Sequence, residues 1–286
     1  MNLAKFVATM ETEGMAKNTI DTYAGHVNRF QKWCVQSTGA EVAVLYRENF
    51  MDFRSYLLNI RQLSPTSVNQ YIAALYKLNQ FLVDEGVQEQ IVIFKRDHLK
   101  VQAPMTDPWE GKEIEVAQLR QTILSTTPRY ANQHKRDYAM VTLMANAGLR
   151  VSEVINLQLT DISLENRQIR VVGKGGKSRV IFINDKTVNA FREYIDIRNP
   201  ASDSPFVFIS RKGPKLNRQQ INRILKKVSN TLHPHLLRHF YCSQTQKKAG
   251  FSLAETANQA GHSNLRTTLR YTHPDAQEMK EKVNKL

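Results

Sequence analysis

The sequence predicts a mainly α-helical protein with one small β-hairpin, and three observations predict it. Apolar residues recur at three- and four-residue steps through much of the 286-residue chain, which is the period of amphipathic helices. Two short segments, 167–172 and 178–183, flank the sequence Gly-Lys-Gly-Gly-Lys, an arrangement typical of a β-hairpin. The chain is also long enough for two domains, each with its own core.

Residues 1–86 are expected to form a bundle of four helices. One apolar stripe follows Asn18-Thr19, and its members are Ile20, Tyr23, Val27, Phe30 and Cys34. A further helix is expected over 46–60. The next begins at Ser64-Pro65, where a capping residue precedes an early proline, and it ends at Gly86.

Residues 87–115 are expected to link two domains, because Pro104, Pro108 and a basic stretch interrupt the periodicity there. The second domain is expected over 116–286. Its helices are expected over 116–126, 135–148, 151–158, 186–198, 217–230 and 234–248, and one more strand over 206–209.

The end of the chain carries three further signals. Ser252 to Glu255 form a capping box, and Gly261 is placed to end the helix that follows it. A short helix is expected around Tyr271, and the last residues are expected to form a separate amphipathic helix. The segment 252–271 also has the pattern of a helix-turn-helix, so it is compatible with DNA binding without chemistry.

The charge of the chain indicates a polyanionic partner. The net charge is +14, whereas residues 1–86 hold equal numbers of basic and acidic residues. The surplus therefore lies in 87–286, dispersed among segments with folded patterns, which favours a nucleic-acid surface over a membrane switch. The sequence shows no secretory signal and no apolar stretch of bilayer length, so a cytoplasmic protein without a membrane partner is expected.

A set of polar residues in the second domain has the composition of a phosphoryl-transfer site. Two arginines, a lysine and two histidines can surround one phosphate, and a tyrosine can attack it. These residues are Arg150, Lys174, His235, Arg238, His262 and Tyr271. No ligand set for a metal ion is visible, and Cys34 and Cys242 are isolated. We therefore expect covalent catalysis with neither metal nor cofactor.

Each of these residues alone has an ordinary interpretation. Arg150 is compatible with a surface salt bridge, although Glu153, three residues on, could orient it for a phosphate. Lys174 is compatible with a solvated turn lysine, and Tyr271 with packing. His235 and Arg238 are three apart, so on a helix they share a face and can place an acid–base group beside a phosphate clamp.

Other basic residues are expected to bind DNA. The hairpin adds Lys177 and Arg179. The basic helix expected over 217–230 keeps an apolar face for the core, so its polar face is free for the major groove. Its basic residues are Arg218, Arg223, Lys226 and Lys227.

Taken together and in order, these motifs resemble the tyrosine recombinases, the phage integrase family. Gly-Leu-Arg-Val-Ser-Glu, Gly-Lys-Gly-Gly-Lys-Ser-Arg, His-Leu-Leu-Arg-His, Gly-His-Ser and Thr-Thr-Leu-Arg-Tyr-Thr-His follow one another from about residue 116 to 273. The chain looks like the compact two-domain members: Xer recombinases, Cre and the tyrosine-type resolvases of replicative transposons. Gln259-Ala260 stand where an apolar pair is commoner, so the packing there is the one departure.

The resemblance implies a fold and a mechanism. The fold is an N-terminal SAM-like core-binding bundle followed by a mixed α+β catalytic domain, whose C-terminal helix is exchanged between protomers. Tyr271 would form a 3′-phosphotyrosyl link, and exchange would pass through a Holliday junction. Arg150 and Arg238 would stabilise charge, Lys174 would be the general acid, His235 would handle the tyrosine proton, and His262 would donate to the phosphate.

The implied partner is double-stranded DNA with inverted-repeat core sites. A monomer or dimer would bind one site, and a homo-tetramer would bind two. Integration, excision and the resolution of cointegrates all remain open as outcomes. A DNA-binding accessory protein without catalysis and a type IB-like topoisomerase are the alternatives.

Overall fold

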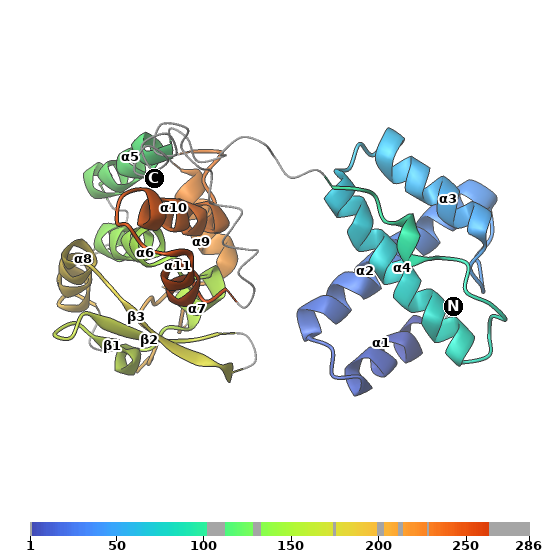
Figure 1. The fold of residues 1–286 in the computed structure, drawn as a ribbon, viewed down its shortest axis with the longest axis horizontal. Helices are drawn as coiled ribbons and strands as arrows, with labels where there is room; N and C mark the ends of the chain where they lie inside the picture. Colours follow the sequence, from blue (N-terminus) through green and yellow to red (C-terminus); the bar gives the residue numbers. More distant parts are fainter. Residues whose placement is uncertain are drawn as a thin grey trace, which may run out of the picture. The chain divides into compact units, whose positions relative to one another are not determined.

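The computed structural model describes residues 2–101, 112–127, 133–173, 176–198, 203–210, 214–227 and 229–262. The chain divides into two compact units, Met1–Ala103 and Pro104–Leu286, and each unit has its own hydrophobic core. Both are mainly helical, and the described part of the second contains a three-stranded antiparallel sheet (Figure 1). The expected fold class is therefore confirmed.

The first unit is a helical bundle whose apolar stripes meet in one core. Its helices are α1 (Leu3–Thr12), α2 (Lys17–Thr38), α3 (Arg47–Ser55), which continues as a π-helical turn (Tyr56–Ile60), and α4 (Pro65–Asp84). Of the stripe expected on α2, Ile20, Val27, Phe30 and Cys34 are buried. Ser64 caps α4 by accepting a hydrogen bond from the backbone N–H of Ser67, as its Ser-Pro start predicts.

The first unit extends past residue 86, where the sequence predicted a linker to begin. Asn79 on α4 accepts hydrogen bonds from the backbone N–H groups of Val92 and Ile93 at 2.7 and 2.9 Å. Ile93 is fully buried, and the Asp97 carboxylate is bound by both terminal nitrogens of Arg47. The stretch lacks helical periodicity because its backbone is held by side chains of α3 and α4.

The second unit is arranged around one buried helix, α6. Its helices are α5 (Lys112–Ser125), α6 (Gln133–Ala147), α7 (Val151–Asn156), α8 (Asp185–Ile195), α9 (Arg218–Lys226), α10 (Pro234–Lys247) and α11 (Leu253–Ala260). Helix α6 contacts α5, α8 and α10, as Figure 1 shows. Consecutive residues of α6, including Met140, Val141, Leu143 and Met144, are buried, so this helix is apolar on nearly all sides.

The sheet contains the expected hairpin and one short additional strand. Its strands are β1 (Ile162–Ser163), β2 (Gln168–Val172) and β3 (Ser178–Phe182), in the order β1-β2-β3. Ile169 pairs with Ile181, and Val171 pairs with Arg179. Side chains directly opposite each other lie on one face of a sheet. The face that buries Ile169, Val171 and Ile181 therefore also carries Arg179.

The strand expected over 206–209 is not present. Phe206 makes a single antiparallel bridge to Gln158, and the carbonyl of Val207 accepts a hydrogen bond from the hydroxyl of Tyr194 instead of from a neighbouring strand. Val207 and Phe208 are fully buried, so the apolar run reflects insertion into the core and not strand pairing. Helix α9 also ends at Lys226, before the expected residue 230.

None of the helices in the described ranges is long and apolar enough to cross a lipid bilayer.

Candidate active site

Arg238 is the most deeply buried of the predicted catalytic residues. It lies on α10, which begins at Pro234 and is capped by the ring of His233. Only 2% of Arg238 is exposed. Its Nη1 donates to the carbonyl of Gly148 at 2.6 Å, whereas its Nη2 is buried and has no hydrogen-bond partner among the described residues. An unsatisfied buried donor costs about 1–3 kcal/mol, and an anionic oxygen would satisfy it.

The carbonyl that holds Arg238 belongs to the turn that leads to Arg150. Gly148 has φ +64°, and a Cβ at this position would overlap the ring of Tyr241, which also lies on α10. Only glycine meets both requirements. Helix α10 and the turn before α7 are thereby fixed against each other, and the two predicted arginines are positioned together.

Arg150 stands at the N-cap of α7, with its side chain 40% exposed. Its Nη1 donates to Oε1 of Glu153 at 3.0 Å, and its Nη2 donates to the carbonyl of Gly261 at 2.6 Å. Its backbone N–H donates to Oε2 of Glu153 at 2.8 Å. The sequence predicted that Glu153 orients Arg150, and these contacts are those of an orienting carboxylate.

Glu153 binds two arginines at once. Its side chain is 2% exposed, and Nη1 and Nη2 of Arg179 donate to its two oxygens at 2.9 and 3.1 Å. Burial raises the pKa of the Glu153 carboxyl, but the hydrogen bonds from Arg179 and Arg150 outweigh it and hold the pKa below its ordinary value. The carboxylate is therefore ionised while it orients Arg150.

His262 follows α11, which ends at Gly261 with φ +69°. The pKa of His262 is lowered to about 4, first by burial and then by the charges of Arg238, Arg150, Arg179 and His235. The pKa of His235 is also lowered, first by burial and then by Arg238. Both imidazoles thus lie in the field of the same arginines, and both are neutral at pH 7.

His239 is a neighbour that the sequence motif did not single out. Its ring lies 4.4 Å from that of His235, measured between centroids. Burial lowers its pKa to about 3, with His235 and Arg238 contributing next. The lowered pKa of this third imidazole indicates the same property as the other two. The cluster holds an excess of positive charge, which a bound anion would neutralise.

The remaining predicted residues fall into three groups. Lys174 and Tyr271 lie outside the described residues, although β2 and β3 flank Lys174 as predicted. Lys177 is exposed, whereas the side chain of Arg179 is only 15% exposed and faces Glu153. On α9, Ile221, Ile224 and Leu225 are buried, and the exposed basic residues are Arg218, Arg223, Lys226 and Lys227.

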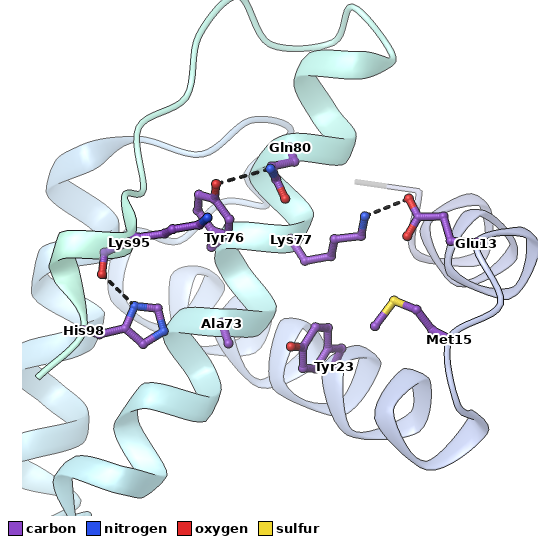
Figure 2. Close-up of a pocket in the computed structure, with 9 residues that line it drawn as sticks. All are labelled: Glu13, Met15, Tyr23, Ala73, Tyr76, Lys77, Gln80, Lys95 and His98. Carbon is purple, nitrogen blue, oxygen red and sulfur yellow. Dashed lines mark hydrogen bonds and ion pairs between the residues drawn. The ribbon is translucent and has the colours of Figure 1, made fainter. Parts of the chain in front are cut away.

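A separate hollow lies in the first unit and carries no comparable chemistry. It has a volume of about 560 Å³ and is lined from α2, α4 and the segment around Lys95 and His98. Figure 2 shows Lys77 reaching from α4 to Glu13 at the end of α1, with Tyr23 beside them. The main cation facing this hollow from α4 is therefore already paired, unlike Arg238.

Comparison with known protein families gives two matches that together cover most of the chain. Residues 113–278 match the family described as the phage integrase family. Residues 3–91 match the phage integrase N-terminal SAM-like domain. The first match covers more than half of the chain, and it includes every predicted catalytic position.

Individual relatives resemble the chain along its whole length. A protein named TnP I resolvase from Bacillus thuringiensis is 38% identical over 291 residues, covering 100% of both chains. Tyrosine recombinase XerC from Roseiflexus castenholzii is 28% identical and covers 92% of this chain and 85% of its own.

Two solved structures share the fold. XerH recombinase bound to its difH substrate has a TM-score of 0.69 at 22% identity, covering 92% of this chain and 78% of its own. The integrase of transposon Tn1549 in complex with transposon right end DNA has a TM-score of 0.70 at 19% identity, covering 100% and 99%.

Proposed function

The chain belongs to the phage integrase family of tyrosine recombinases, and we propose that it recombines double-stranded DNA through a transient bond between Tyr271 and a DNA phosphate. One observation of the site carries the proposal. Within the part of the chain that the structure describes, Nη2 of the buried Arg238 has no hydrogen-bond partner, and Arg238 lies beside an Arg150 that Glu153 orients. Two cations that converge in this way fit the non-bridging oxygens of a phosphodiester.

In the first step the hydroxyl oxygen of Tyr271 attacks the phosphorus, and the bond to the 5′-oxygen breaks. His235 accepts the tyrosine proton, for which its lowered pKa suits it because the imidazole is neutral at pH 7. Lys174 donates a proton to the leaving 5′-oxygen. The products are a 3′-phosphotyrosyl bond and a free 5′-hydroxyl. Lys174 and Tyr271 receive these roles from their motifs.

In the second step a 5′-hydroxyl of the partner duplex attacks the phosphotyrosyl bond and gives its proton back to Lys174, while Tyr271 leaves with the proton returned by His235. One phosphoester bond is broken and one is formed in each step, so ATP is not required. Two rounds pass through a Holliday junction.

During each step Arg150 and Arg238 stabilise charge on the phosphate. Loss of one such preorganised donor typically costs about 3–4 kcal/mol of transition-state stabilisation. A neutral His262 adds an N–H donor to the same phosphate. Because the arginines already neutralise the phosphate, we expect the reaction to need no metal ion.

The DNA is proposed to be held by both units in different ways. In the second unit, Arg223 and Lys226 of α9 are exposed and would contact phosphates in a major groove. In the first unit, a hollow of about 470 Å³ is lined mainly by uncharged residues of α2 and α4, among them Asn18, Thr66 and Gln70. Amide and hydroxyl groups of this kind hydrogen-bond to DNA without adding charge.

The assembly and the biological outcome are also proposals. We propose inverted-repeat core sites, a monomer or dimer on one site, a tetramer on two, and exchange of the C-terminal helix between protomers. The relative named as a resolvase supports resolution of cointegrates as the outcome. The relatives solved with DNA support a DNA partner and hence action where the genome lies, in the cytoplasm.

The test is to trap the covalent intermediate. The substrate is a duplex carrying an inverted repeat taken from the DNA beside the gene, with a nick near the cleavage position. After cleavage, the short fragment that carries the new 5′-hydroxyl diffuses away, and the protein stays bound to the 3′-phosphate. We expect an adduct that resists denaturation, forms in excess EDTA and maps to Tyr271. Binding without an adduct would indicate an accessory protein. An adduct with plasmid relaxation but no exchange between two sites would indicate a topoisomerase.

A further inference from the structure

Arg179 lies on the inner face of the sheet, although the sequence suggested that it reaches DNA. It pairs with Val171 across the hairpin, and its side chain is 15% exposed. Every nitrogen of its guanidinium is engaged within the protein. Nη1 and Nη2 bind the two oxygens of Glu153 at 2.9 and 3.1 Å. Such a bidentate pair fixes the orientation of both groups.

The same guanidinium also binds the end of α11. Its Nε donates to the carbonyl of Gln259, and its Nη2 donates to that of Ala260, each at 3.2 Å. The last carbonyls of a helix have no partners within it, and a cation there also complements the helix dipole. A second contact supports this junction, because Oε1 of Gln259 accepts a hydrogen bond from the backbone N–H of Phe182.

Gly261 allows this close approach. A Cβ at residue 261 would lie 2.5 Å from Cζ of Arg179 and 2.6 Å from its Nη1, so no other residue fits against the guanidinium. Gly261 also has φ +69°, which favours glycine. Its carbonyl accepts the hydrogen bond from Arg150, and His262 follows directly.

These contacts join three segments that carry predicted catalytic residues. The hairpin carries Lys174, the start of α7 carries Arg150, and the end of α11 leads to His262. We infer that Arg179 is a positioning residue that holds these three segments in register through Glu153 and the carbonyls of α11. The inference rests on the proposed function of this site, and it gives Arg179 no contact with DNA.

A matched control is available on the neighbouring strand. Arg170 on β2 forms an ion pair with Asp161 at 2.8 Å, but its side chain is 60% exposed and it lies on the outer face. Arg170→Ala therefore removes the same charge from the same hairpin without touching the junction. Arg179→Lys keeps the charge of Arg179 but loses the planar fork, and it serves as a second variant if Arg179→Ala folds poorly.

The experiment compares the full-length variants on the nicked duplex. We expect Arg179→Ala to slow adduct formation at saturating DNA by on the order of 100-fold, since a displacement of about 1 Å can cost this much. The half-saturating DNA concentration and its salt dependence should stay at the wild-type values. Arg179→Lys should be slowed nearly as much, and Arg170→Ala should match the wild type.

A spectroscopic readout separates positioning from general loss of structure. Arg179 helps to lower the pKa of His262, so the NMR titration of the His262 ring should move to higher pH in Arg179→Ala and stay in place in Arg170→Ala. A wild-type rate at saturating DNA in Arg179→Ala, or a salt slope lowered by roughly 1, would overturn the inference.

Failure of the wild type to form any adduct would count against the proposed function instead. The His262 titration of Arg179→Lys then decides the inference, because this variant keeps the positive charge and loses only the planar fork that binds Glu153 and the α11 carbonyls. A moved His262 pKa in Arg179→Lys would support it, and an unmoved pKa would overturn it.

Discussion

The two units bury charged groups in opposite ways. In the first unit, Asp97 is 5% exposed, and both of its oxygens are bound by Arg47 at 2.5 and 2.6 Å. In the second unit, Arg238 is 2% exposed, its Nη1 binds the Gly148 carbonyl, and its Nη2 has no partner among the described residues. In the first arrangement the carboxylate is fully paired, whereas in the second one buried donor of the guanidinium can still accept an anionic partner.

This difference separates a structural ion pair from a binding site. A buried cation without a carboxylate is costly, and the cost shows in Arg238, whose pKa burial lowers to about 10. The buried carboxylate Glu153 is shared by Arg150 and Arg179. Under the proposed function, this arrangement would cost stability in the free protein and stabilise a bound phosphate, as preorganised sites do.

The largest expected effect concerns the nucleophile. Tyr271→Phe should bind DNA as tightly as the wild type and form no covalent adduct, because only the attacking oxygen is removed. The measurement is the yield of denaturation-resistant complex on the nicked duplex. Tyr46→Phe in the first unit, where the residue is 55% exposed, is the control and should keep the full yield. An undiminished adduct in Tyr271→Phe would assign the chemistry to another residue.

The second prediction compares the buried Arg238 with Arg47, the partner of the buried Asp97. Arg238→Met should lower the rate of adduct formation about 10²–10³-fold, while its unfolding free energy should stay equal or rise, since an unsatisfied buried cation is removed. Arg47→Met should do the reverse. It leaves Asp97 buried without a partner, so the first unit should lose about 3 kcal/mol of stability.

Chemical denaturation and single-turnover cleavage of both variants provide the measurements. Equal losses of stability in the two variants would contradict the contrast between the units, as would a normal cleavage rate in Arg238→Met.

The sequence predicted the helices well because their apolar stripes are long. The stripe of α2 and the cap of α4 needed no information from distant residues. The predictions for residues 87–101 and 206–209 were wrong, because side chains distant in the sequence determine the backbone conformation there. Asn79 accepts hydrogen bonds from the backbone of Val92 and Ile93, and the residues of 87–101 by themselves do not predict this contact.

Arg179 shows the same limit within the site. Alternate residues of β3 lie on two faces, one with Arg179 and Ile181 and the other with Val180 and Phe182. The charge of Arg179 alone predicts that its face is exposed. In the structure the opposite face is exposed, because Val180 and Phe182 are 51% and 59% exposed. The register with Val171 on β2 decides the orientation, and register is not encoded in one strand. The catalytic roles remain a prediction, and the sequence could offer it because the residue types of these motifs, taken together, have one chemical use.

The third prediction uses pH. The pKa of His262 is about 4 in the folded protein, below its ordinary value of 6.5, so the unfolded chain takes up a proton first as the pH falls from 6.5 to 4. Stability of the second unit should therefore drop across this window. The wild type should lose about 2–4 °C more than His262→Asn, which corresponds to about 1 kcal/mol.

Thermal melting of residues 104–286 between pH 7.5 and 5 measures this loss. Bound DNA should reduce it, because a phosphate favours the protonated imidazole. Parallel curves for the wild type and His262→Asn would show that the pKa of His262 is not depressed in the folded protein.

The smallest expected effect is on salt dependence, and it tests where DNA is held. Residues 1–86 carry no net charge and residues 1–103 carry only +1, and the hollow between α2 and α4 is lined by uncharged side chains. Each phosphate neutralised by a cation adds roughly 1 to the slope of log affinity against log salt. Residues 104–286 should therefore show a steep slope, and residues 1–103 a shallow one.

Within the full-length protein, Arg223→Ala/Lys226→Ala on α9 should lower the slope by roughly 2, because two phosphate contacts are lost. Lys32→Ala/Arg61→Ala in the first unit removes the same charge from exposed positions and should leave the slope nearly unchanged. Fluorescence anisotropy of a labelled duplex at several salt concentrations gives both values. A steeper slope for residues 1–103 than for 104–286 would reverse the assignment, because the nearly neutral unit would then make most of the phosphate contacts. Wild-type affinity in Arg223→Ala/Lys226→Ala would show that α9 does not contact DNA. If the two cations did contact phosphates, their loss would reduce the number of counterions released on binding and so lower the affinity.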